Sequence, residues 1–170
     1  VYRTEHPTPQ WERKNWRNLN GEWEFAAGEG KFSRKIRVPF CPESALSGVE
    51  THFPEGDVLC YRRRFTLPEG FDRGRVLLHI GAADQVCDVF VNGHLVGHHE
   101  GGYEAFSFDV TDAFADENLL EVTVTDNLPD HVLPWGKQCR RRGGMWYTPT
   151  TGIWQTVWME RVPEIYVKLL

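Results

Sequence analysis

Apolar side chains recur at every second position along most of this 170-residue chain, and this alternation limits its fold more than any other feature. Alternation gives a β-strand one apolar face, whereas an amphipathic helix needs a period of 3.6, which is nearly absent here. Alternating or apolar segments occupy residues 18–25, 36–38, 59–67, 75–80, 86–91, 94–96, 106–110, 120–124, 153–159 and 165–169. The pattern therefore predicts an all-β protein of about nine strands, spaced as in a sandwich.

Three segments give sharper predictions. Residues 86–91 are apolar at almost every position, which is typical of a central strand covered on both faces. Asn92-Gly93 follows directly and favours a two-residue hairpin turn, because both positions of a type I′ turn require positive φ. Residues 153–159 are expected to form one continuous strand, and Ile165, Val167 and Leu169 a last one.

Composition excludes several classes of protein. The chain is 41% hydrophobic with 22 aromatic residues, as in ordinary globular domains, and its length favours one domain. A net charge of −5 disfavours nucleic-acid and anionic-membrane partners, and no apolar run approaches the ~20 residues that span a bilayer. Four cysteines without a C-x-x-C pair favour reduced thiols and a cytoplasmic location. The chain begins with neither Met nor an apolar signal stretch.

Residues 126–151 form the one long segment without alternation. Irregular segments of this length are usually functional or disordered, and the aromatic residues Trp135, Trp146 and Tyr147 argue against disorder. We expect these side chains to pack on something, which lies either within this chain or outside it.

Motifs for common chemistries are missing or weak. His98-His99-Glu100 lacks a third ligand at a recognisable spacing, and adjacent strand residues point to opposite faces, so no metal site is predicted. No phosphate loop, dinucleotide motif or nucleophile elbow is present, and no cofactor is expected. Among 24 acidic residues no pair stands out as the two carboxylates of a glycosidase, so no catalytic residue is assigned. In Arg62-Arg63-Arg64, Arg63 should share a face with Tyr61 while its neighbours face outward.

Several segments together resemble the N-terminal domain of glycoside hydrolase family 2, the β-galactosidase and β-glucuronidase family. The resemblance covers about residues 6–162. It rests on Gln10 to Trp16, Leu19 to Phe25, Val38-Pro39-Phe40, Cys60 to Phe65, Val89 to Gly93, Val96 to Tyr103, Phe106 to Thr111, and Tyr147 to Trp158, in this order and spacing. The resemblance implies a jelly-roll-like, galactose-binding-domain-like antiparallel β-sandwich over residues 1–163. Residues 164–170 would be its last strand or the start of a following immunoglobulin-like domain.

In that family both catalytic glutamates lie in a downstream TIM barrel, which needs about 250 residues. The resemblance therefore implies a non-catalytic domain whose partners are a weakly bound carbohydrate and the downstream immunoglobulin-like and barrel domains. The family carries an aspartate six residues before its closing Gly-Ile strand, and Trp146 occupies that position here. The family's asparagine contact also has no clear counterpart in residues 47–56.

Six residues are candidates for a carbohydrate or interdomain contact: Trp135, Trp146, Tyr147, His99, Glu100 and Tyr103. The aromatic loop would border the active site of the whole enzyme or anchor the domain to the barrel. The segment from His98 to Tyr103 would touch a ligand or form a turn. Two other functions remain open, a self-sufficient carbohydrate-binding module and a small jelly-roll glycosidase, and so do the sugar and the oligomeric state.

Overall fold

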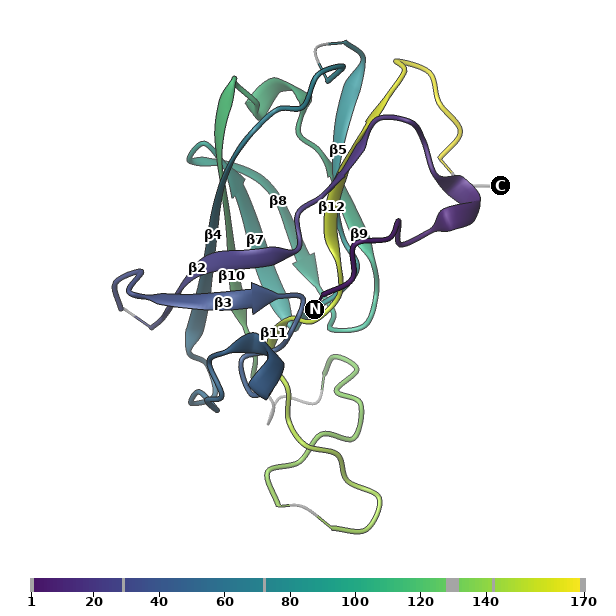
Figure 1. Ribbon diagram of the computed structural model, residues 1–170. Helices are drawn as coiled ribbons and strands as arrows, with labels where there is room; N and C mark the ends of the chain where they lie inside the picture. Colours follow the sequence, from purple (N-terminus) through teal and green to yellow (C-terminus); the bar gives the residue numbers. More distant parts are fainter. Residues whose placement is uncertain (1, 29, 72, 128–131, 142, 169–170) are drawn as a thin grey trace.

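The computed structural model describes residues 2–28, 30–71, 73–127, 132–141 and 143–168, and Figure 1 shows two β-sheets packed face to face. The strands are β1 (Trp16–Asn18), β2 (Gly21–Ala27), β3 (Arg34–Val38), β4 (Val58–Thr66), β5 (Arg75–Ile80), β6 (Ala83–Asp84), β7 (Val86–Val91), β8 (His94–Glu100), β9 (Phe106–Asp109), β10 (Glu117–Thr125), β11 (Gly152–Ile153) and β12 (Val157–Val162). Helical structure in the described residues is limited to the 3₁₀ turns η1 (Pro9–Trp11), η2 (Ala45–Ser47) and η3 (Thr111–Ala113). The all-β prediction is confirmed.

The larger sheet has the order β3-β2-β4-β10-β7-β8, and the smaller one β1-β12-β5-β9. Every pairing between named strands is antiparallel, and a short β11-β6 pair lies at one end. Side chains from both sheets meet in one core, which includes Tyr61, Val89 and Leu120 from the large sheet and Leu78 and Met159 from the small one. The predicted antiparallel β-sandwich is therefore present.

The strand expected over residues 18–25 is divided in two, because the chain changes sheet at this point. β1 pairs with β12 in the small sheet, and β2 pairs with β3 and β4 in the large one. Between them, the buried Asn20 accepts from the Val157 backbone N–H at 3.0 Å and donates to Thr156 Oγ1 at 3.2 Å. Gly21 has φ +119°, in the region that favours glycine. Strands that switch sheets make the corners of a sandwich.

The continuous strand expected over residues 153–159 is likewise wrong. β11 pairs with β6, whereas β12 pairs with β5 and β1, and residues 154–156 belong to neither strand. Here the Ala82 carbonyl accepts from the backbone N–H groups of both Trp154 and Gln155. The chain again leaves one sheet for another.

The expected last strand is also wrong across its described residues. β12 ends at Val162, Pro163 follows, and no strand includes residues 164–168, where Ile165 is 92% exposed. Leu169 lies outside the described residues. The tail is held instead by the N-terminal segment (below).

The apolar run of residues 86–91 forms β7, which differs in one respect from the prediction. β7 lies between β10 and β8, so it is paired on both edges, but only alternate residues are buried and the predicted cover on both faces is wrong. The hairpin turn is confirmed, since Asn92 and Gly93 have φ +52° and +82°. Asn92 also donates to the Ala113 carbonyl at 2.9 Å. This side-chain contact fixes the turn against η3.

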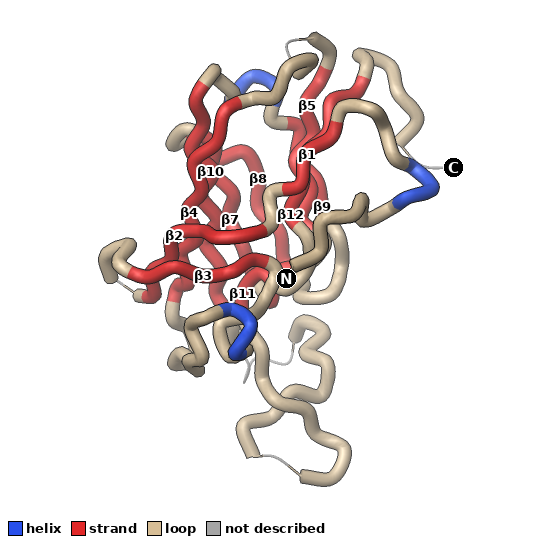
Figure 2. Tube along the Cα trace, in the orientation of Figure 1, coloured by secondary structure: helices blue, strands red, loops and turns tan. Residues whose placement is uncertain are grey.

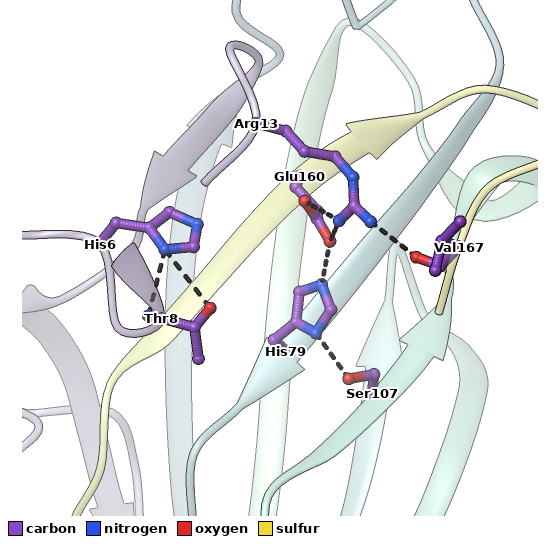
Figure 3. A network of polar contacts seen from close by, with 7 residues as sticks. All are labelled: His6, Thr8, Arg13, His79, Ser107, Glu160 and Val167. Carbon is purple, nitrogen blue, oxygen red and sulfur yellow. Dashed lines mark hydrogen bonds and ion pairs between the residues drawn. The ribbon is translucent and has the colours of Figure 1, made fainter. Parts of the chain in front are cut away.

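The outer face of the small sheet carries a polar network that joins the two ends of the chain (Figure 3). One guanidinium nitrogen of Arg13 contacts both oxygens of Glu160, at 2.6 and 2.7 Å, and the other donates to the Val167 carbonyl at 2.9 Å. His79 Nε2 lies 3.3 Å from Glu160 Oε1, and its Nδ1 is 2.6 Å from Ser107 Oγ. Arg13 therefore ties the segment before β1 to the segment after β12.

Burial alone would raise the pKa of Glu160, but its contacts with His79 and Arg13 outweigh burial, so its pKa lies below the usual value. Its side chain is only 3% exposed. Nearby, the buried His6 ring meets the Trp16 and Trp158 rings edge-on, each at 4.7 Å between centroids. This face is thus covered by the N-terminal segment.

Candidate functional site

The long loop of residues 126–151 projects from the end of the sandwich where β11 lies, opposite the C-terminal tail (Figures 1 and 2). Its described part is ordered by its own contacts. Trp135 and Trp146 stack with centroids 5.5 Å apart, and Tyr147 exchanges backbone hydrogen bonds with Lys137 and Cys139. The described part of the loop is therefore folded on itself.

Gln138 fastens this loop to the sandwich. Its buried amide donates to Asp84 Oδ2 at 2.7 Å and lies 3.0 Å from the Tyr103 hydroxyl, and its oxygen accepts from the Thr150 N–H at 2.6 Å. Asp84 belongs to β6 and pairs with Gly152 of β11. One side chain thus joins the loop, the short β6-β11 pair and Tyr103.

The glycine at position 152 is required by this packing. It has φ +77°, and a Cβ there would collide with the Tyr61 hydroxyl, which itself accepts from the Ile153 N–H at 3.3 Å. Tyr61 is fully buried in the core. Gly152 therefore lets the chain return close to the core after the loop.

A pocket of about 230 Å³ opens where the loop rejoins the sandwich. Its lining comes from the segment after β3, the segment before β4, the start of β4, and the loop that follows β10. The lining residues are Glu43, His52, Phe53, Pro54, Glu55, Asp57, Leu59, Asp126, Arg140, Thr148, Pro149 and Thr151. The pocket combines an apolar wall with four carboxylates.

Two of these carboxylates hold the loop. Glu43 accepts from the Thr151 hydroxyl at 2.8 Å and from the Thr151 N–H at 3.2 Å. Glu55 forms an ion pair with Arg140 Nε at 2.7 Å. Each contact joins a pocket wall from the sandwich to one from the loop, so the pocket depends on both.

Asp126 differs from these two. It is 9% exposed, and within the described part of the chain its carboxylate has neither a hydrogen bond nor an ion pair. Burial, followed by the charges of Asp84, Glu43 and Glu55, raises the pKa of Asp126 to about 7, and Arg140 only partly opposes them. At neutral pH this side chain can donate or accept a hydrogen bond.

Asp84, behind the pocket, is a second carboxyl of this kind. Burial and the charge of Glu43 raise its pKa to about 6, although the hydrogen bond from Gln138 acts in the opposite direction. It is 2% exposed. Two acids with raised pKa in one cluster mark a functional-site candidate.

The predicted contact residues are only partly brought together. Trp135, Trp146 and Tyr147 belong to the loop but do not line the pocket, and Trp146 and Tyr147 are 42% and 65% exposed. Tyr103 joins the loop through Gln138 and meets the Trp154 ring edge-on. These aromatics thus form the outside of the loop and its base.

His99 and Glu100 lie apart from the pocket lining. The His99 ring stacks on Phe106 at 3.9 Å, while Glu100 contacts the exposed His98, whose pKa is raised by hydrogen bonds to Asp88 and then Glu100. No group of three potential metal ligands occurs among the described residues. All four cysteines are free.

Glu43, His52 and Asp126 line the pocket but were not among the predicted contact residues. Asp126 carried a signal, because it is the first residue after the alternating strand β10 and opens the long loop. Glu43 and His52 carried none, because the topology brings them to the pocket from a distant part of the chain. The Arg62-Arg64 prediction holds for Arg63, which donates to the Leu19 and Asn20 carbonyls. Its neighbours lie on the opposite face of the strand, as predicted: Arg64 is exposed, and Arg62 is half-buried there because it pairs with Glu121.

In chemical terms the pocket suits a small polyhydroxylated ligand. Carboxylates accept hydrogen bonds from hydroxyls, and the walls formed by Phe53, Leu59 and Pro149 offer an apolar surface to C–H groups.

No described residue belongs to a helix long and apolar enough to cross a membrane.

Comparison with known proteins gives consistent matches. The family model for the glycosyl hydrolase 2 galactose-binding domain-like domain matches residues 34–132. A β-galactosidase of Thermoanaerobacter pseudethanolicus is 29% identical over 89% of this chain and 20% of its own length. A β-glucuronidase of Formosa agariphila is 27% identical over 89% of this chain and 17% of its own length. The chain thus spans about a fifth of these relatives.

Solved structures agree on the fold. The β-D-glucuronidase of Dictyoglomus thermophilum aligns with a TM-score of 0.68 over 92% of this chain and 30% of that one, at 23% identity.

Proposed function

Because the chain belongs to the glycosyl hydrolase 2 galactose-binding domain-like family and corresponds to the N-terminal domain of β-galactosidase- and β-glucuronidase-like proteins, we propose that it is the non-catalytic, saccharide-contacting domain of a retaining glycosidase. The parent protein would act in carbohydrate metabolism. Residues 1–163 would form the domain and residues 164–170 the connection to an immunoglobulin-like domain, followed by a TIM barrel. An all-β chain of 170 residues has no room for that barrel.

One observation carries the proposal. The acid-lined pocket and the exposed aromatic loop lie at the same end of the sandwich, and Thr148, Pro149 and Thr151 belong to both. A domain that contributes to an active site elsewhere needs such a combination, a polar pocket beside a projecting apolar surface. The pocket would contact a sugar, and Trp146 and Tyr147, which lie outside it, would anchor the domain to the barrel.

Hydrolysis assays test the non-catalytic role. The purified chain should give no turnover of p-nitrophenyl β-galactoside or β-glucuronide above that of heat-denatured protein. Asp126→Asn serves as a control for contamination, because activity from a contaminant does not change with it. Turnover that falls in Asp126→Asn would show that this chain is itself a glycosidase.

The exposed aromatic side chains also favour a second candidate, a self-sufficient carbohydrate-binding module. Stacking on one or two aromatic rings contributes about 1–3 kcal/mol, whereas millimolar binding already needs about −4 kcal/mol. Calorimetry with galactose, glucuronic acid and short oligosaccharides should therefore show no dissociation constant tighter than roughly 1 mM. A micromolar constant would favour the binding module.

A test of the anchoring role of the loop needs a longer chain that carries the barrel. There Trp146→Ala should lower the melting temperature at unchanged KM. A raised KM at unchanged melting temperature would instead place the indole at the active site.

A further inference from the structure

The charges in the pocket are unbalanced. Glu43, Glu55, Asp57 and Asp126 contribute four carboxylates, against one guanidinium from Arg140 and the imidazole of His52. The guanidinium is engaged by Glu55 at 2.7 Å. Three carboxylates therefore remain without an arginine or lysine among the lining residues.

Asp126 is the part of the pocket left open to a ligand. It is nine-tenths buried, it lines the cavity, and it has no hydrogen-bond or ion-pair partner within the described ranges. The Asp126 oxygens are not fully enclosed, since the fully buried side-chain polar atoms without a hydrogen bond in the described residues are His6 Nε2 and His79 Nε2. An unpartnered carboxylate in a cavity is a vacant hydrogen-bond acceptor.

The negative potential at this position already acts on Asp126 itself. After burial, the main causes of its raised pKa are the charges of Asp84, Glu43 and Glu55. Any further anion that enters the cavity is repelled by the same charges. A neutral hydroxyl group can instead donate hydrogen bonds to these carboxylates.

Size and apolar surface narrow the ligand further. At about 230 Å³ the cavity is smaller than the 300–1,000 Å³ typical of sites for drug-sized ligands, which leaves room for one sugar ring. Phe53, which packs on the core ring Phe25 at 5.7 Å, and Pro149 supply rigid apolar walls.

We propose that this pocket accepts a neutral hexosyl ring and excludes uronates, an inference that rests on the saccharide-contacting role proposed above. The relatives include both β-galactosidases and β-glucuronidases, so their names leave the choice open. The carboxylates at the pocket favour the neutral ring, because they repel the negative charge of a uronate. One additional negative charge beside Asp126 and Glu43 should weaken binding by roughly tenfold at low ionic strength.

Methyl β-D-glucoside and methyl β-D-glucuronide provide a matched pair of probes, because they differ only in whether C6 is a hydroxymethyl group or a carboxylate. The ¹⁵N-labelled chain is titrated with each at pH 8 and low salt, and shifts are followed at the backbone amides of Gly56, Asp57 and Thr151. The glucoside should shift these amides with a dissociation constant in the millimolar range or weaker. The glucuronide should bind at least about tenfold more weakly.

Asp126→Asn removes the charge at constant shape and should reduce this ratio severalfold. Asp88→Asn is the matched control, since it makes the same change of net charge on an exposed residue outside the pocket and should leave the ratio unchanged. The amide spectrum of each variant reports whether it is folded. The wild-type pair of titrations tests the proposal even if a variant is not.

Equal or tighter binding of the glucuronide would overturn the proposal, and so would pocket amides that respond to neither glycoside. An unchanged ratio in folded Asp126→Asn would also contradict it. Pocket amides that respond to neither glycoside would also count against the saccharide-contacting role, whereas tighter binding of the glucuronide would leave that role in place and overturn the selectivity alone. The non-catalytic role fails only if the chain hydrolyses glycosides.

Discussion

Two carboxylates in this molecule are buried to nearly the same degree and behave in opposite ways. On the outer face of the small sheet, Glu160 is 3% exposed and is satisfied by Arg13 and His79. At the pocket, Asp126 is 9% exposed and has no such partner among the described residues. The pKa of the first lies below its usual value and that of the second is raised to about 7.

The difference separates structure from function. A buried carboxylate with all its partners contributes to holding elements together, whereas one without partners costs stability. Such a cost is characteristic of sites that act on something else. Four substitutions or conditions test how far this comparison holds.

The largest effect is expected at Arg13. Arg13→Gln leaves the buried Glu160 with His79 as its one charged partner among the described residues, and removing one partner of a buried pair costs about 3 kcal/mol of unfolding free energy. Urea denaturation measures this. Arg37→Gln is the control, because within the described part of the chain Arg37 is bonded to the Leu46 carbonyl alone, at the surface, and its loss should cost under about 1 kcal/mol. Equal losses in the two variants would contradict the distinction.

Asp126→Asn should have the opposite sign. At pH 8 it removes a buried, unpaired charge, and we expect the unfolding free energy to rise by about 1 kcal/mol. Asp109→Asn should lower it instead, because Asp109 accepts from Thr111 and pairs with Arg75. If both variants are destabilised alike, Asp126 has a partner in solution and the comparison fails.

The pH dependence follows from the same groups. A carboxyl whose pKa is raised on folding binds more protons in the folded state than in the unfolded state. Its contribution to the free energy of unfolding is therefore fully present below the unfolded pKa near 3.8, and it is lost as pH rises through the folded pKa. For Asp84 and Asp126 these folded values are about 6 and about 7.

Stability should therefore fall by about 1 kcal/mol between pH 5 and pH 8, after allowance for solvent that reaches the pocket. Urea denaturation at both pH values measures this difference. Asp126→Asn should show a smaller slope. Stability that rises across this range would contradict the assignment.

Trp146 should give the smallest effect. Its indole is 42% exposed, and Trp135 is its one ring partner among the described residues, so Trp146→Ala should change the unfolding free energy of this chain by about 0.5 kcal/mol. Trp23→Ala, at a buried core position, should cost about 3–5 kcal/mol. A loss of several kcal/mol at Trp146 would mean that the loop is part of the core.

The fold was largely predictable because alternation reports burial directly. The pattern failed at residues 19–20 and 154–156, where apolar positions continue in step while the chain changes sheet. Both halves of each predicted strand bury side chains in the same core, so the pattern of burial does not record which partner strand they pair with. The Asn20 contacts that accompany the first change are made across the fold.

The site was less predictable for a related reason. Trp146 and Tyr147 stood out by residue type, yet the pocket is built from Glu43, Asp126 and Arg140, which are ordinary charged residues in the sequence. Their significance comes from burial and from the absence or presence of a partner. Those are properties of the folded chain.

Arg13 has a mechanical consequence. The chain enters the small sheet through β1 and leaves it through β12, and these strands are antiparallel neighbours with Trp16 opposite Glu160. Tension applied between the two ends would peel this three-residue pairing apart one bond at a time rather than shear it. The Arg13 contacts to Glu160 and Val167 lie at the fork where that peeling begins. Under load they would yield before the two sheets separate, so the distant pocket would keep its shape while the ends of the domain are pulled.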